Sequence, residues 1–217
     1  MAPARVTTGE VAARVDDLEG LAVRARALAR PDRRAILGLT GAPGAGKSTL
    51  GAELVDVLGP TSVLVPMDGF HLAGLELSRL GRSDRKGAPD TFDVEGYLAL
   101  LRRLRAGSGS TVYAPEFRRE IEEPIAGAIA VTPHHALVVT EGNYLLDEGA
   151  GWADVRQLLD AVWYLDIPDD ERRRRLVARH EAHGASLEDA RAHALGSDER
   201  NAERVRGTRW RADLVLA

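Results

Sequence analysis

The chain has 217 residues, of which 44% are hydrophobic and 29% charged, as in a globular protein with one α/β domain. Its formal net charge of −4 offers no bulk attraction to nucleic acid or anionic lipid, and the absence of cysteine excludes disulfides and thiolate chemistry. No segment resembles a membrane span or the apolar core of a secretory signal, so we expect a cytoplasmic protein without nucleic-acid or membrane partners.

The predicted elements alternate between helices and short apolar strands. Apolar residues recur at helical spacing over residues 10–29, with Thr8 as the N-cap and Pro31 as the stop. In chain order, the remaining predictions are a strand over 35–40, a helix over 48–58, a strand over 62–67, a polar glycine-rich segment over 68–93, a helix over 94–105, strands over 136–140 and 161–165, charged helices over 169–183 and 186–206, and a strand over 213–216.

Apolar strands that alternate with helices indicate a parallel sheet covered on both faces. We therefore expect a three-layer α/β fold with a central parallel sheet. The sequence has no internal repeat and no long linker, which predicts a single domain over residues 1–217. Within this domain, residues 1–31 hold the N-terminal helix, and about 169–206 hold a lid and the helix after it. The N-terminal helix could pack on its own core or on a partner, which leaves a homodimer open.

Residues 41–48, GAPGAGKS, match the P-loop pattern G-x-x-x-x-G-K-[ST] at every fixed position and lie between a predicted strand and a predicted helix. Glycines let the loop amides point at phosphate oxygens, and the helix N-terminus adds positive potential. Lys47 can reach the β- and γ-phosphates of a nucleoside triphosphate, and Ser48 can ligate Mg²⁺. The predicted nucleotide-binding residues are Gly41, Ala42, Pro43, Gly44, Ala45, Gly46, Lys47, Ser48 and Thr49.

Other classes of P-loop protein lack support in this chain. A guanine-reading N-K-x-D motif does not occur, because neither lysine follows an asparagine, and the L-S-G-G-Q motif of transporter ATPases is absent. The strand over 136–140 is followed by Glu141 without the Asp-Glu pair common in mechanical ATPases. These absences favour a kinase over a GTPase, a transporter or a motor.

Two carboxylates follow predicted strands. Asp68 comes after the second strand and Glu141 after the third, and ligands of open parallel sheets lie beyond the carboxyl ends of the strands. We therefore expect both carboxylates to face the γ-phosphate from neighbouring strand ends. One can orient and deprotonate an acceptor hydroxyl while the other holds Mg²⁺.

Several motifs in order along the chain resemble the phosphoribulokinase/uridine kinase family of P-loop kinases. They are GLTGAPGAGKST, VPMDGFH, APDTFDVEGY, VYAPEFRRE, VTEGNYLL and ERRRRLVARH, which together run from about Ile36 to the C-terminus. Within the family the chain is most similar to the branch of nucleoside/nucleotide kinases or fructose-transport-system kinases, with pantothenate kinase as a cousin. The resemblance implies a P-loop kinase fold with an arginine-rich helical lid.

The resemblance also implies roles for individual residues. Asp68 matches the catalytic base, and Glu141 matches the carboxylate near magnesium and acceptor. Arg175 and Arg179 match the lid arginines of the family, which close over the phosphates. By their spacing, both share a helix face with Arg172. The acceptor site would use Asp90 and Phe92 of the P-D-T-F-D segment, Tyr113 and Arg118 of a hairpin, and His71. Asn201 and Arg209 fall where the family places the adenine.

These observations predict an enzyme that binds ATP and Mg²⁺ and phosphorylates a hydroxyl group of a small-molecule acceptor. Its catalytic residues would be Lys47, Asp68, Glu141, Arg175 and Arg179, and its metal ligands Ser48 and Glu141. Uridine kinases usually have a hydroxyl or aromatic partner after the Asp, where this chain has Gly69-Phe70-His71, and their P-x-Y-D segment reads V-Y-A-P here. The acceptor could therefore equally be a sugar or a pantothenate-like alcohol. A nucleoside acceptor remains an alternative, which would require Phe70, Phe92, Tyr113 and Phe117 to sandwich a base. An ATP-binding regulatory module without small-molecule turnover is an alternative of another class.

Overall fold

The central sheet of the protein is fully parallel. The computed structural model describes residues 17–30, 33–107, 109–149, 151–182, 184 and 186–217. Five strands are hydrogen-bonded in the order β2-β5-β1-β6-β7, and every neighbouring pair is parallel. This arrangement confirms the predicted α/β class and brings the ends of β2 and β5 side by side. The strands are β1 (Ala35–Gly41), β2 (Ser62–Pro66), β5 (Leu137–Glu141), β6 (Ala161–Leu165) and β7 (Leu214–Leu216).

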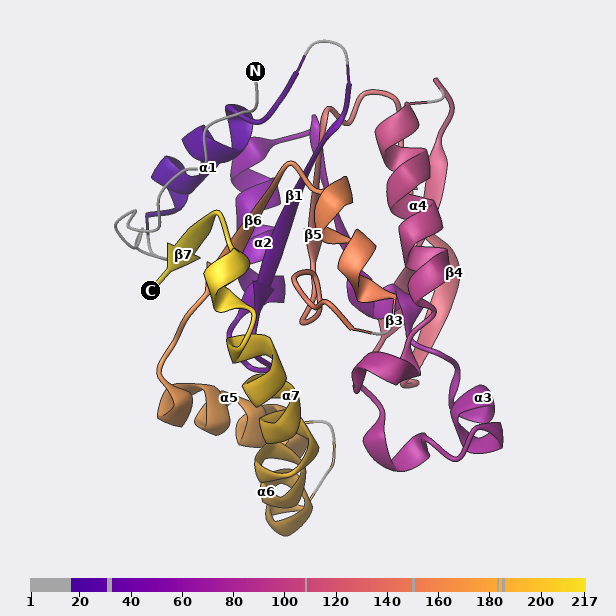
Figure 1. Cartoon of the computed structure of the whole chain (residues 1–217), viewed down its shortest axis with the longest axis vertical. Coiled ribbons are helices and arrows are strands. Elements are labelled where there is room, and N and C mark those ends of the chain that lie inside the picture. The colour runs from indigo at the N-terminus through magenta and orange to yellow at the C-terminus, as the bar shows by residue number, and fades with distance from the viewer. Residues whose placement is uncertain (1–16, 31–32, 108, 150, 183, 185) are drawn as a thin grey trace.

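Helices cover both faces of the sheet, which makes three layers (Figure 1). One apolar cluster joins α1 (Leu18–Arg26) and α2 (Lys47–Leu58) to one face through Leu21, Leu37 and Leu54. A second cluster joins α4 (Val94–Ala106) to the other face. The residues of the three inner strands, β1, β5 and β6, are buried because each face of the sheet has its own helical layer, as continuous apolar runs indicate.

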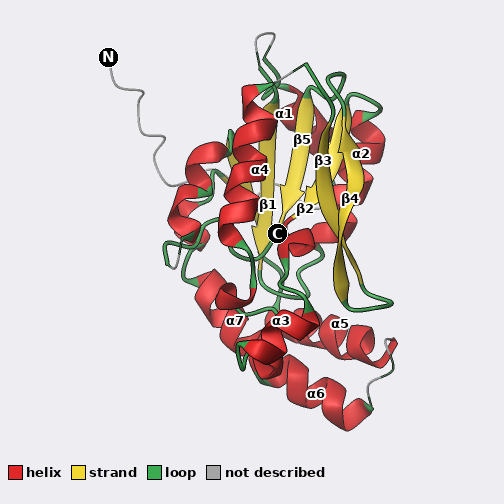
Figure 2. Ribbon diagram, turned by 90° about the vertical axis from the view of Figure 1, so that its right-hand side faces the viewer, coloured by secondary structure: helices red, strands yellow, loops and turns green. Residues whose placement is uncertain are grey.

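Three helices lie together beyond the carboxyl ends of the strands, at the bottom of Figure 1. They are α5 (Asp169–Ala182), α6 (Leu187–Leu195) and α7 (Ser197–Arg206), and together we call them the lid helices. A two-stranded antiparallel hairpin of β3 (Val112–Arg118) and β4 (Glu123–Val131) stands beside the sheet (Figure 2). The short helix α3 (Gly74–Arg79) lies near the same end of the molecule as the lid helices. Loops at the carboxyl ends of the strands are therefore surrounded by the lid helices and by the hairpin.

Three predicted elements differ from the observed ones. The N-terminal helix begins at Leu18, where the Asp17 side chain accepts a hydrogen bond from the Gly20 amide, and ends at Arg26. Residues 10–16, the predicted N-cap Thr8 and the predicted stop Pro31 lie outside the described residues. The helix predicted over 186–206 is two helices, because the backbone turns at Gly196. The segment over 68–93 contains α3, whose buried Leu77 was not predicted to pack. Among the described residues no helix is both long and apolar enough to cross a membrane.

Candidate active site

The loop between β1 and α2 has the backbone that its glycines permit. Gly44 and Gly46 have φ angles of 82° and 94°, in the left-handed region that favours glycine. A Cβ atom at Gly44 would lie 2.8 Å from the carbonyl oxygen of Arg172 and 2.7 Å from a side-chain carbon of Leu176. The first turns of α5 therefore lie directly against the loop, and only glycine fits at this position.

Lys47 is buried at the start of α2 and its ammonium group is held over the loop. The Nζ atom donates hydrogen bonds to the carbonyl oxygens of Gly41, at 3.0 Å, and Ala42, at 3.2 Å. Burial lowers the pKa of this ammonium, although the carboxylates of Glu141 and Asp68 act in the opposite direction. A poorly solvated cation that is held at the P-loop backbone is well suited to bind phosphate oxygens.

Ser48 and Glu141 form a pair of oxygen donors next to Lys47. The Ser48 hydroxyl donates a hydrogen bond of 2.9 Å to Oε1 of Glu141. The Glu141 side chain is buried, and burial together with the nearby Asp68 charge raises its pKa above the ordinary value. The preceding residue fixes the strand end, since the Thr140 hydroxyl donates to the Val65 carbonyl oxygen at 2.7 Å. Glu141 is therefore aimed at Ser48 by a buried, hydrogen-bonded strand.

Asp68 lies one residue beyond Met67, in a short 3₁₀ helix (Met67–Phe70) that follows β2. Its Oδ2 accepts a hydrogen bond of 3.1 Å from the Arg119 guanidinium, which comes from the β3–β4 turn. A Cβ atom on Gly69 would lie 2.4 Å from the Pro115 carbonyl oxygen, so glycine allows the hairpin to approach this closely. The motif Asp68-Gly69 therefore does two things: it supplies the carboxylate and admits the hairpin that carries its cationic partner.

His71 lies between two aromatic rings beside Asp68. Its ring centroid is 4.1 Å from that of Phe92 and 4.7 Å from that of Phe117, and its Nδ1 is 2.8 Å from the Asp68 carbonyl oxygen. Burial lowers the pKa of this imidazole below its usual 6.5, which keeps the ring neutral at neutral pH. Phe117 also has the Lys86 ammonium 5.0 Å and the Arg119 guanidinium 5.6 Å from its ring centroid. Phe92 and Phe117, two of the rings that would have to stack on a base, therefore already pack against His71, and Phe117 also packs against two cations.

Two cavities meet at the P-loop. The loop cavity, of about 660 Å³, is lined by residues 44–50 and by Leu165, Ile167 and Arg175. The carboxylate cavity, of about 360 Å³, is lined by Asp68, His71 and Glu141 from the core and by lid residues. Both cavities share the lining residues Gly44, Lys47, Ser48, Arg119 and Arg179.

Lid arginines occupy different positions along α5. Arg175 lines the loop cavity, and its Nε donates to Oε1 of Glu171 at 2.7 Å. Arg179 lines both cavities, and burial lowers the pKa of its guanidinium. Arg172, predicted to share their helix face, is instead buried and faces the back of the P-loop. The structure therefore brings Lys47, Ser48, Asp68, Glu141 and Arg179 together, with Arg175 beside them.

Some predicted acceptor residues lie elsewhere. Asp90 forms an ion pair with Arg85, with oxygen and nitrogen 3.0 Å apart, and lines neither cavity. Tyr113 is 59% exposed on β3, and Arg118 donates to Glu116 at 2.9 Å on the outside of the hairpin. Phe92 and His71 do line the carboxylate cavity.

The residues expected near adenine also take other positions. Asn201 lines the carboxylate cavity, and its Nδ2 donates to the Gly87 carbonyl oxygen at 3.3 Å. Arg209 forms an ion pair with Asp166 at 2.7 Å and lines neither cavity.

Sequence reasoning extended the hairpin to Arg119 but named Arg118 as its acceptor residue, whereas Arg119 is the one that contacts Asp68 and lines both cavities. It adjoins Arg118, and the alternation of strand side chains stops at the turn after Arg118, so the pattern could not tell which arginine faces inward. Sequence reasoning missed His180, His193 and Asp198, lid residues that line the carboxylate cavity. The His180 ring and the Asp198 carboxylate are 2.9 Å apart, which closes this end of the cavity with a polar contact.

The parallel sheet, the P-loop and the two strand-end carboxylates define a nucleotide-binding P-loop protein with a site for a second ligand. No protein-family model matches the chain. The chain is 33% identical over 213 residues to a Schizosaccharomyces pombe protein that carries the provisional name uridine kinase, a match that covers 93% of this chain and 91% of that protein. Over 143 residues it is 30% identical to a pantothenate kinase of Mycolicibacterium vanbaalenii, covering 63% of this chain and 45% of the relative.

A solved structure agrees with these matches. It is that of a provisionally named fructose transport system kinase from Silicibacter sp. TM1040, with 38% identity, a TM-score of 0.83, and coverage of 92% of this chain and 98% of that one. The chain belongs to the phosphoribulokinase/uridine kinase family of P-loop kinases. It is a small-molecule kinase that uses ATP.

Proposed function

We propose that this protein transfers the γ-phosphoryl group of Mg·ATP to a hydroxyl group of a sugar or of a pantothenate-like alcohol. The observation that carries the proposal is the position of Asp68 in a polar cavity that shares Lys47 and Ser48 with the loop cavity. Phosphoryl transfer requires a donor and an acceptor side by side with a base at the acceptor, and this arrangement supplies both.

Donor binding is assigned to the P-loop. The amides of residues 44–46 and the Lys47 ammonium would hold the β- and γ-phosphates, with Thr49 at the start of α2. Leu165 and Ile167 give this cavity an apolar wall, as expected for the nonpolar part of a nucleotide. Arg175 and Arg179 would neutralise charge on the phosphoryl group as it moves.

Magnesium fits the pair formed by Ser48 and Glu141. A hydroxyl and a carboxylate 2.9 Å apart beside the phosphate loop are the hard oxygen donors that Mg²⁺ prefers. The ion, when bound, would neutralise negative charge on the phosphate oxygens. Glu141 would hold it directly or through water, and its buried position keeps the carboxylate from rotating into solvent.

Asp68 would act on the acceptor. In the transfer, the acceptor oxygen forms a bond to the γ-phosphorus, the bond from that phosphorus to the oxygen of the ADP leaving group breaks, and the hydroxyl proton passes to an Asp68 oxygen. Arg119, 3.1 Å from Asp68, would hold this carboxylate in place and reach toward the transferring group, since it lines both cavities.

The polar lining of the carboxylate cavity favours a polyhydroxylated acceptor. Asn143, His193 and Asp198 offer hydrogen-bonding groups, whereas Phe92 and Phe117 pack against His71. Of the other two rings that a base would need, Phe70 packs on Tyr97 in the core and Tyr113 is exposed on the hairpin. A nucleoside acceptor remains the second candidate because of the provisional name of the fission-yeast relative.

The test is ADP release from Mg·ATP by the purified protein, screened against separate pools of sugars, pantothenate-like alcohols and nucleosides. We expect the sugar or alcohol pool to raise the rate about tenfold or more, and Lys47→Ala to abolish the increase. Stimulation by nucleosides alone would replace the proposed acceptor with the second candidate. A rate of ADP release that no pool changes would contradict both acceptor assignments and would favour the hypothesis of an ATP-binding regulatory module.

A further inference from the structure

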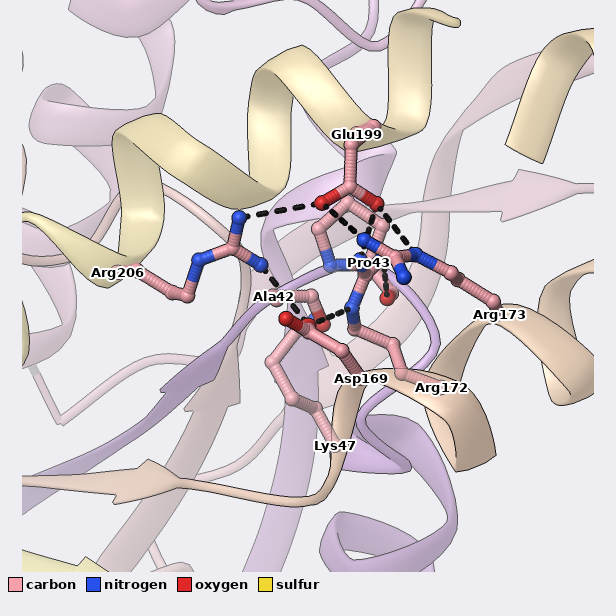
Figure 3. Close-up of polar contacts among 8 residues, drawn as sticks. All are labelled: Ala42, Pro43, Lys47, Asp169, Arg172, Arg173, Glu199 and Arg206. Carbon is pink, nitrogen blue, oxygen red and sulfur yellow. Dashed lines mark hydrogen bonds and ion pairs between the residues drawn. The ribbon is translucent and has the colours of Figure 1, made fainter. Parts of the chain in front are cut away.

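Three consecutive carbonyl groups of the P-loop are held by buried cations. Lys47 donates to the carbonyl oxygens of Gly41 and Ala42. Nη1 of Arg172 approaches the carbonyl oxygen of Pro43 at 3.5 Å (Figure 3). Because carbonyl and amide groups of one peptide point in opposite directions, holding these carbonyls on one side helps turn loop amides toward the other. The third cation belongs to the lid helix α5 and not to the loop.

Arg172 is 1% exposed, and each of its three nitrogens has a partner. Nε donates to Oδ1 of Asp169 at 3.0 Å, and Nη2 donates to Glu199. A buried guanidinium is stable only when its charge is compensated and its nitrogens have acceptors, and here two carboxylates and one carbonyl oxygen provide this. These partners fix the position of the Arg172 side chain, and its contact with the Pro43 carbonyl oxygen fixes that carbonyl as well.

The two carboxylates extend the contact to the far side of the lid. Glu199 also accepts hydrogen bonds from Arg173 and Arg206, each at 3.1 Å. Asp169 accepts one from Arg206 at 2.9 Å. The hydrogen bonds that Glu199 accepts from Arg173, Arg172 and Arg206 lower its pKa to about 2, so its carboxylate stays ionised at neutral pH. We call this set the ionic tether; it comprises Asp169, Arg172, Arg173, Glu199 and Arg206 (Figure 3).

The ionic tether joins three segments that are distant in the sequence. It connects the first turn of α5 to both ends of α7, and through Pro43 it connects both helices to the P-loop. Gly44 adds to this contact, because the backbone of α5 at Arg172 lies against it. The base of the lid is thus fixed to the loop, and Arg175 and Arg179 project over the loop cavity from a helix whose start is held.

We propose that Arg172 and Glu199 are positioning residues for nucleotide binding: they hold the Pro43 carbonyl and the first turn of α5 together, so that the loop amides and the lid arginines face the phosphates before the nucleotide arrives. Preorganisation of this kind raises affinity because the ordering cost is met during folding. Neither residue lines the loop cavity, so each acts through the loop and not on the nucleotide itself.

The test compares dissociation constants for ADP and AMP, measured by titration calorimetry on the full chain with Mg²⁺. The ratio of the AMP constant to the ADP constant reports what the β-phosphate adds, and the β-phosphate depends on the loop amides. A general loss of folded protein lowers the fraction that binds but leaves this ratio unchanged. We expect Arg172→Met to lower the ratio about fivefold or more. Glu199→Gln should lower it less, about threefold, because Arg172 keeps its contacts with Asp169 and Pro43.

Arg172→Lys provides a graded variant. An ammonium group keeps the charge but cannot reach three partners in fixed directions as the planar guanidinium does, so the ratio should fall between those of Arg172→Met and the natural protein.

The matched control is the ion pair between Arg204 and Asp147. It also ties α7 to the core through a buried carboxylate, but it touches neither the P-loop nor α5. Arg204→Met should reduce thermal stability and leave the AMP-to-ADP ratio unchanged. A ratio within about twofold of the natural value in folded Arg172→Met would overturn the proposal. Should Arg172→Met fail to fold, an unchanged ratio in folded Glu199→Gln has the same force.

Discussion

The loop cavity and the carboxylate cavity share five lining residues but are built in different ways. The loop cavity is made largely by one continuous segment, residues 44–50, whose motif requires its own backbone shape. The carboxylate cavity is assembled from the 3₁₀ helix after β2, the end of β5, the hairpin, the loop around Lys86, and all three lid helices. The proposed donor site is therefore a local property of the chain, whereas the proposed acceptor site depends on how distant segments meet.

This difference implies that changes at the two cavities should have separable effects. Substitutions in the P-loop should affect every reaction that uses ATP. Substitutions in the carboxylate cavity should affect acceptor chemistry and leave nucleotide binding largely intact. Residues that line both cavities, such as Arg119, should affect both.

Lys47→Ala should cause the largest loss. The ammonium is the buried cation closest to the loop carbonyls, and removing it should lower kcat/KM for ATP by about 10³-fold, with ADP binding weakened as well. Acceptor-stimulated ADP release and ADP calorimetry measure the two effects. Weakened turnover with unchanged ADP affinity would contradict the assignment of Lys47 to the donor.

Asp68→Asn should lower kcat by about 10²-fold, since the amide cannot accept the hydroxyl proton. Its KM for ATP should stay close to the natural value, because Asp68 lies in the carboxylate cavity and not in the loop cavity. Steady-state kinetics with the acceptor found in the screen measure both constants. Turnover within about threefold of the natural protein would show that Asp68 is not the base.

Adjacent arginines provide a matched pair for the hairpin. Arg119→Met should lower acceptor-dependent turnover about tenfold, because Arg119 contacts Asp68 and lines both cavities. Arg118→Met should change turnover by less than about twofold, because Arg118 is exposed and pairs with Glu116. Similar losses of turnover in both variants would mean that the two arginines contribute equally, and would contradict a specific role for Arg119.

The smallest expected effect is on stability. Burial raises the pKa of Glu141 above its ordinary 4.5, so the folded protein binds this proton more readily than the unfolded chain. The stability that this group contributes is fully present below its ordinary pKa and is lost as pH rises through the raised value. Without Mg²⁺ at neutral pH, Glu141→Gln should therefore raise Tm by about 2–4 °C.

Thermal unfolding in a chelating buffer, followed from about pH 5 to about pH 8, checks the sign of this effect. The difference between Glu141→Gln and the natural protein should grow as the pH rises. If Glu141→Gln is less stable than the natural protein at the upper end of this pH range, burial does not destabilise the ionised Glu141 carboxylate and the prediction is wrong.

Local sequence determined the strand, the loop and the helix that form the P-loop. The P-loop motif predicted a strand that ends at Gly41 and a helix that starts near Lys47, and the structure has both. This prediction was possible because the glycines that permit the loop backbone and the amides that bind phosphate belong to the same few residues. The placement of Asp68 and Glu141 at neighbouring strand ends was also predictable, since parallel strands align their carboxyl ends.

Only the tertiary structure decided which polar residues complete the site. It selected Arg119 over Arg118 at a turn where strand alternation no longer applies, and it moved Asp90 into an ion pair away from the cavity. It also broke the last predicted helix at Gly196, which separates His193 on α6 from Asp198 and Glu199 on α7. Long charged side chains can reach many partners, and the choice among them is made by packing between segments that the sequence does not place next to one another.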